Sequence, residues 1–147
     1  MTGEMKTEPT LLKKDRTGVR RLPHGAIDLI EKAAQQAGYA SLIADLGGCR
    51  DKHSLLRKLA SAMHFPLWFG NNWDALADCV TDMSWQPAAG YVIILQHTQA
   101  MQDSAEEDLV TAIDILAEGA RDWGARNIPM WVLVEVHDNS RIKLPEL

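Results

Sequence analysis

The sequence has few cysteines and no long apolar run. Its two cysteines, Cys49 and Cys79, are too few for a disulfide framework and show no C-x-x-C spacing. No apolar run approaches the roughly 20 residues that a helix needs to cross a bilayer, and residues 1–18 contain no apolar segment typical of a secretory signal. We therefore expect a cytoplasmic protein with reduced thiols and no membrane contact.

The sequence also lacks the motifs that mark common catalytic and cofactor sites. It contains no G-x-G-x-x-G, no P-loop, no G-x-S-x-G and no H-E-x-x-H, and no two of its five histidines lie four residues apart. An enzyme would have to combine Asp74 and Asp78 with His64, or use Cys79 as a nucleophile, and carboxylates four residues apart are weak evidence for such chemistry. We therefore expect no catalytic residues, no metal site and no cofactor.

The net charge of −5 is unevenly distributed. Residues 65–147 contain thirteen acidic and four basic side chains, which gives this part a formal charge of −9. A field of that sign repels phosphate backbones, so we expect no nucleic acid among the ligands. A basic protein partner fits this charge, although acidic side chains also serve solubility.

Apolar periodicity and turn residues divide the chain into segments. Residues 1–22 are polar and basic without periodicity, and we expect them to form a flexible lead-in. An extra helix is expected within 23–38, the main domain within 39–136 and a polar tail at 137–147. In these segments the patterns predict helices at 26–37, 51–63, 71–83 and 103–123, and strands at 39–46, 90–97 and 129–136. Because helices separate the strands, the expected fold class is α/β, with a small three-stranded parallel sheet, packed helices and the extra N-terminal helix.

The helix expected at 71–83 carries three aspartates at intervals of four residues, Asp74, Asp78 and Asp82, so their carboxylates align along one side. Like charges at this spacing destabilise a helix by about 0.2–0.5 kcal/mol per pair. Only Asp74, in the first turn, gains from the helix dipole. Two interpretations remain open: a solvated acidic face, or a surface presented to a cationic partner. The other side of this helix is a core-facing stripe that consists of Trp73, Leu76, Val80 and Met83.

The turn before this helix places large rings beside the carboxylates. Trp68 and Phe69 precede Gly70, which permits a positive φ and close approach of the backbone to a partner. An aromatic side chain next to charged groups is a common composition for an interface hot spot, whereas Phe69 is expected to cap the core. Asn71 or Asn72 is the expected N-cap of the helix.

The pattern F-P-x-W-F-G-N-N-W-D-A-L-A-D-C at residues 65–79 resembles the signature of the barstar family, whose members are intracellular inhibitors of secreted barnase-type ribonucleases. The likeness extends in weaker form over about residues 39–136. It implies a small three-stranded parallel sheet with packed helices. It also implies a function: stoichiometric inhibition of a basic ribonuclease, whose active site an acidic helix and the preceding aromatic loop would block.

The resemblance also implies roles for single residues. Trp68 would pack on the nuclease, Asn72 would fix the loop, and Asp74 and Asp78 would lie among basic groups of the nuclease, Asp78 in the place of a substrate phosphate. The full set of expected partner-binding residues is Trp68, Gly70, Asn71, Asn72, Asp74, Ala77, Asp78 and Asp82.

The chain departs from the family pattern in three respects, one of which is that residues 1–38 have no equivalent in it. Ala77 stands where the best-known member has an interface tryptophan. Gly119, between Glu118 and Asp122, falls near a further interface carboxylate, so the contribution of the 103–123 helix stays open. Fold does not fix function, and the alternative is an immunity or regulatory protein that binds a different basic toxin. The target and the oligomeric state also stay open.

Overall fold

The computed structural model describes residues 11–66 and 69–147 of the chain. Its elements in chain order are η2 (Lys14–Arg16), β1 (Gly18–Arg21), α1 (Ile27–Ala37), β2 (Ala40–Asp45), α2 (Lys52–Ala62), α3 (Trp73–Asp82), β3 (Tyr91–Gln96), α4 (Gln99–Ser104), α5 (Glu106–Ala125) and β4 (Met130–Val134). No helix among these elements is both long enough and apolar enough to cross a membrane.

The strands form one parallel sheet of four strands in the order β1-β4-β3-β2. The expectation of three strands is wrong, because residues 18–21 form β1 rather than part of a flexible lead-in. This strand has the sequence GVRR and all its residues are half-buried, so it shows neither an apolar run nor an alternation. Its pairing with β4, which only the folded chain supplies, accounts for the strand.

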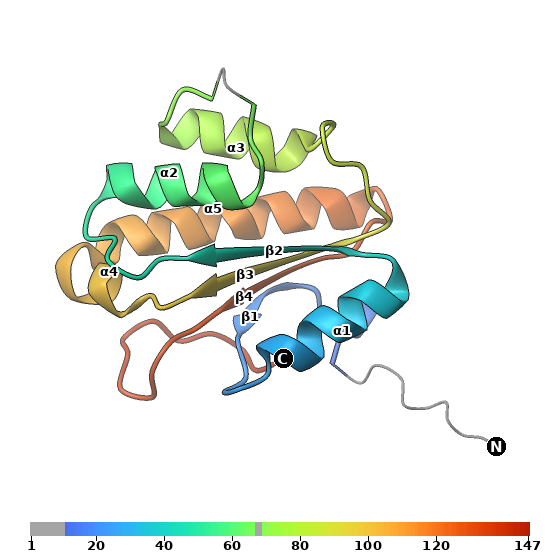
Figure 1. Ribbon diagram of the computed structural model, residues 1–147, viewed down its shortest axis with the longest axis horizontal. Coiled ribbons are helices and arrows are strands. Elements are labelled where there is room, and N and C mark those ends of the chain that lie inside the picture. Colours follow the sequence, from blue (N-terminus) through green and yellow to red (C-terminus); the bar gives the residue numbers. More distant parts are fainter. Residues whose placement is uncertain (1–10, 67–68) are drawn as a thin grey trace.

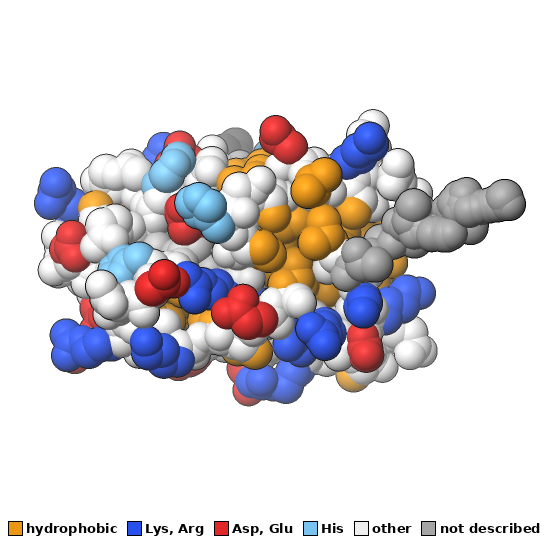
Figure 2. All heavy atoms as spheres, turned by 90° about the horizontal axis from the view of Figure 1, so that it is seen from below, with side chains coloured by type: hydrophobic (Ala, Val, Ile, Leu, Met, Phe, Trp, Pro, Cys, Tyr) orange, Lys and Arg blue, Asp and Glu red, His pale blue; other side chains and the backbone are white. Residues whose placement is uncertain are grey.

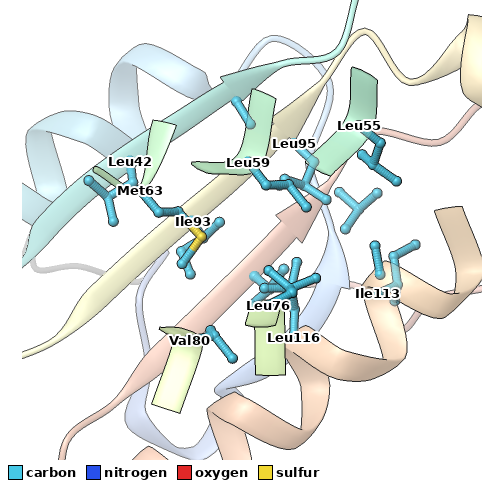
Figure 3. Packing of buried hydrophobic residues seen from close by; sticks show 14 of the residues in the cluster. Leu42, Leu55, Leu59, Met63, Leu76, Val80, Ile93, Leu95, Ile113 and Leu116 are labelled. Carbon is cyan, nitrogen blue, oxygen red and sulfur yellow. The ribbon is translucent and has the colours of Figure 1, made fainter. Parts of the chain in front are cut away.

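Helices cover both faces of the sheet (Figure 1). On one face, side chains of the sheet meet those of α2, α3 and α5 in the main core, including Leu42, Leu59, Leu76, Ile93 and Leu116 (Figure 3). On the other face, α1 buries Ile30 and Ala34 against a second cluster that includes Val92, Ile94 and Trp131. The extra N-terminal helix therefore covers the second face of the sheet.

The predicted helices occur near their expected positions, with α5 in the place of the helix expected at 103–123, and a short helix that was not predicted, α4, precedes it. The helix α4 ends at Ser104, and Ala105 separates it from α5 with an extended φ of −152°. The first turn of α5 is acidic, with Glu106, Glu107 and Asp108. Negative side chains at a helix N-terminus interact favourably with its dipole, which fixes the start of α5 at this point.

Candidate functional site

The helix α3 begins at a capped residue. Asn72, in an extended conformation, accepts a hydrogen bond at its Oδ1 from the amide of Ala75 over 2.8 Å. Its Nδ2 donates to the carbonyl of Gly70 over 3.4 Å. Of the two candidates, Asn72 is therefore the N-cap, while Asn71 adopts a left-handed φ of 55° and has a buried Oδ1 without a hydrogen-bond partner in the described part of the chain. The loop and the first turn of α3 are thus tied together by side-chain hydrogen bonds.

The inward side of α3 packs closely on α5. Leu76, Val80 and Met83 are fully buried, as the predicted stripe requires, whereas Trp73 is only partly buried. A Cβ atom at Gly119 of α5 would lie 2.9 Å from Val80 Cγ1, so the glycine permits the short approach of the two helices. These contacts hold α3 in a defined position relative to the sheet.

Side chains from the end of α5 hold the end of α3. The indole of Trp123 donates to the carbonyl of Val80 over 2.8 Å. The guanidinium of Arg126 lies 3.8 Å from the centre of the Trp123 ring and donates to the carbonyl of Thr81 over 2.8 Å. Sequence analysis missed Arg126, which lies 45 residues from Thr81 and belongs to no motif.

The outward side of α3 is acidic, as the spacing of the aspartates predicts. Asp74, Asp78 and Asp82 are exposed, and within residues 11–66 and 69–147 none of them forms an ion pair. Ala77 lies between them, half-buried, and its carbonyl accepts a hydrogen bond from the Thr81 hydroxyl over 3.0 Å. The three carboxylates are therefore available to a cationic partner.

The neighbouring carboxylates of α5 are engaged within the protein. Glu118 accepts from Arg121 over 2.8 Å, and Asp122 accepts from Arg126 over 2.6 Å. Gly119 between them is buried against α3. Near Gly119, therefore, the two carboxylates of α5 have their charges compensated, whereas the three carboxylates of α3 form no ion pair with any described residue.

The loop before α3 contains two aromatic residues, Trp68 and Phe69. Phe69 is partly buried against the main core, with its ring centre 5.1 Å from that of Phe65, so the expectation that it caps the core is confirmed. Trp68 lies outside the described residues. The Nζ atom of Lys52 lies 5.7 Å from the centre of the Trp73 ring, a contact that the sequence did not reveal.

The side chains considered for a catalytic function include Cys79 and His64, whose surroundings differ. Cys79 is buried; burial, and then the charges of Asp82 and Asp78, raise the pKa of its thiol. The Nδ1 atom of His64 lies 2.9 Å from Gln86 Oε1. Among the described residues, no group of three or more His, Cys, Asp and Glu side chains is arranged to hold a metal ion.

A separate cavity of about 1010 Å³ lies at the carboxyl ends of the strands, among the residues that follow β1, β2, β3 and β4. At its edge, Asp45 Oδ1 accepts from the amide of Gly47 over 2.9 Å and lies 2.8 Å from His97 Nδ1. The Gly47 amide, followed by His97, lowers the pKa of Asp45, and the hydrogen bond to Asp45 raises the pKa of His97. Sequence analysis missed this pair because 52 residues separate its members.

Comparison with known proteins gives one family. A family model described as Barstar (barnase inhibitor) matches residues 39–135, about two thirds of the chain. No curated protein matches the chain. The matched range includes the sheet strands β2, β3 and β4 and the acidic helix, and leaves β1 and α1 outside. The chain belongs to the barstar family.

Proposed function

We propose that this protein is an intracellular inhibitor that binds a basic, barnase-like ribonuclease in a one-to-one complex and blocks its active site. The single observation that carries the proposal is the row of exposed, unpaired carboxylates on a helix that the core holds rigidly. Membership of a family described as barnase inhibitors supports the choice of partner. The protein itself catalyses no reaction in this proposal.

The chemistry of the inhibition follows from the charges on α3. A ribonuclease that binds the phosphates of RNA presents cationic side chains in its active site, and a carboxylate can take the place of a phosphate oxygen pair there. Asp78, in the middle of α3, is the residue we assign to this place, with Asp74 beside it one turn earlier. Asp82 extends the charge along the helix, and Trp68 with residues 69–72 supplies the shape of the contact.

Rigidity contributes to affinity because a preorganised surface loses little freedom on binding. The Asn72 cap fixes the start of α3, and the Trp123 and Arg126 side chains hold its end. The exposed charges also attract a basic partner from a distance, which raises the association rate at low ionic strength.

The proposal is tested by titration of barnase-like ribonucleases with the purified protein while RNA hydrolysis is followed. Inhibition should saturate at one equivalent. Asp78→Ala should weaken it, because it removes the central carboxylate, whereas Asp114→Ala, which removes an exposed and unpaired carboxylate of α5, should leave it unchanged. Equal effects of the two substitutions, or no inhibition of any enzyme of this class, would contradict the proposal. Binding to a basic deoxyribonuclease toxin in place of a ribonuclease would favour the alternative function.

A further inference from the structure

The cavity at the carboxyl ends of the strands is walled in part by segments that lie outside the family match. His24 and Asp28, which follow β1, and His137, which follows β4, line the cavity and lie outside the matched residues 39–135. Its volume of about 1010 Å³ corresponds to the upper end of the range of about 300–1,000 Å³ that is usual for small-molecule sites. The N-terminal strand and helix therefore complete a cavity of the size that small molecules occupy.

The cavity lies where the chain changes from one face of the sheet to the other. After β1 the chain enters α1, which packs on one face, whereas after β2 and β3 it enters α2 and α4, which pack with α5 on the opposite face (Figure 1). The strand β4, between β1 and β3, leads into the C-terminal tail. In open parallel sheets, ligands bind outside the carboxyl ends of the strands at such a switch point. The topology therefore favours a ligand at this place.

Most carboxylates of the cavity wall are already engaged by the protein. Three of them accept a hydrogen bond from a group within it: Asp103, Glu135 and Asp138. The donors are the side-chain amide of Gln99, the backbone amide of His97 and the guanidinium of Arg21, respectively. Asp28 is the remaining carboxylate of this wall; it is exposed in the first turn of α1 and forms no ion pair with a described residue.

Several donors of the wall, by contrast, are free. Arg50, His24 and His137 are exposed, and none of them forms a hydrogen bond or an ion pair with another described residue. Figure 2 shows histidine side chains gathered at one end of this face of the molecule, among acidic and basic groups. The start of α1 adds backbone amides, because a helix leaves its first amides without a partner inside the helix and no side chain caps those of α1. The unpaired groups of the wall are therefore mainly donors.

We propose that this cavity binds a small organic phosphate, a metabolite that carries a phosphate ester. The phosphate contacts His24, His137 and the first amides of α1, since a helix N-terminus favours an anion and a phosphate offers more acceptor atoms than a carboxylate. The organic part extends across the strand ends, where its oxygen atoms reach Arg50. Leu22 and Pro23 supply apolar surface to its carbon atoms.

The dimensions and the charge of this region fit such a ligand. The four strands span about 14 Å at about 4.8 Å between neighbours, so a lone phosphate ion cannot contact the groups that follow β1 and those that follow β2 at the same time. Residues 1–64, which contribute His24 and Arg50, contain eleven basic and seven acidic side chains, a formal charge of +4. This part of the chain therefore attracts an anion, unlike the acidic residues 65–147.

The proposed site is separate from the acidic surface of α3. No residue of α3 lines the cavity, and α3 packs on α5. Phosphate binding and nuclease inhibition can therefore be measured independently, and either can fail without the other. Asp78→Ala, which is expected to weaken inhibition, should leave phosphate binding unchanged.

The test titrates the isotope-labelled full chain with AMP and glycerol phosphate while the backbone amide resonances are recorded. Inorganic phosphate, adenosine and glycerol are titrated in parallel. Both esters should shift the resonances of residues around the cavity, such as Gly25 and Gly48, and should leave those of α3 unchanged. Inorganic phosphate should bind more weakly than the esters, and the two uncharged compounds should cause no shift at millimolar concentration.

Substitutions in the wall test the assigned contacts. Arg50→Gln should weaken ester binding about tenfold, because it removes a charge-assisted hydrogen bond, and His24→Gln should weaken it as well. Asp28→Asn should tighten binding, since it removes the unpaired carboxylate of the wall. Arg57→Gln and His53→Gln change exposed residues of α2 outside the wall and should bind as the unaltered protein does.

Three results would overturn the proposal. The first is the absence of shifts around the cavity with both esters. The second is that adenosine binds as tightly as AMP, or inorganic phosphate as tightly as the esters. The third is that Arg50→Gln and His24→Gln bind the esters no more weakly than the two control variants do.

Discussion

The close contact between Gly119 of α5 and Val80 of α3 predicts how Gly119→Ala changes the free energy of unfolding. A Cβ atom at Gly119 would lie 2.9 Å from Val80 Cγ1 and 3.1 Å from Val80 Cγ2, so Gly119→Ala forces either the valine or one helix to move. Overpacking of a core costs about 1–3 kcal/mol in the free energy of unfolding. The same substitution raises the helix propensity at that position by about 1 kcal/mol. The two effects oppose one another, and a control must separate them.

Gly124 provides that control on the same helix. A Cβ atom at this position would contact nothing within 4 Å, so Gly124→Ala keeps the gain in helix propensity without the overpacking. We expect the free energy of unfolding of Gly119→Ala to lie about 1–3 kcal/mol below that of Gly124→Ala. The difference in Tm should be about 2–12 °C for a chain of this size.

Urea unfolding followed by tryptophan fluorescence measures this difference, and the dependence of the free energy on urea should be the same for both variants. Because Gly119 sets the position of α3, its substitution should also weaken inhibition, whereas Gly124→Ala should not. If the two alanine variants are equally stable, the close approach of α3 and α5 does not exclude a side chain at residue 119, and the reasoning is refuted.

Four further predictions concern the N-cap of α3, the pair of His97 and Asp45, and the cysteines. Asn72→Ala removes the N-cap of α3 and should lower the free energy of unfolding by about 0.5–2 kcal/mol in urea denaturation. Because the pKa of His97 is raised in the folded protein, its stabilising effect is present below its ordinary pKa and is lost as the pH rises through the raised value, so His97→Gln should be most destabilising at mildly acidic pH. The pKa of Asp45 is lowered, so its own stabilising effect is lost as the pH falls through that lowered value. Asp45→Asn should therefore change the free energy of unfolding least in strong acid. Cys49 and Cys79 should not react with a thiol reagent in the native protein and should both react in denaturant.

The features that sequence predicted well are those determined by neighbouring residues. The apolar runs that form β3 and β4 need only their own composition to indicate buried strands. The buried and acidic sides of α3 follow from helical spacing, and the structure confirms them. The sequence limited the N-cap to Asn71 or Asn72, and the structure shows that it is Asn72. The family was identified from one gap-free segment of this same region, and the family comparison confirms it.

The features that sequence missed depend on partners far along the chain. The strand β1 exists because β4 offers an edge more than a hundred residues later, and its own residues carry no strand pattern. Arg126 reaches the end of α3 only after the chain has passed through β3 and α5. The short helix α4 was missed as well, because its sequence QAMQDS has a single buried residue, Met101, and so no apolar stripe.

The most direct test of the proposed function measures the association rate with the ribonuclease that the inhibition titration selects, as a function of ionic strength. For the unaltered protein the rate should be high at low salt and fall steeply as salt is added, because the unpaired carboxylates of α3 attract the enzyme. Asp78→Asn should reduce both the rate and its dependence on salt, while Asp114→Asn should behave like the unaltered protein. An association rate that is independent of salt, or that Asp78→Asn leaves unchanged, would contradict the role assigned to the acidic helix.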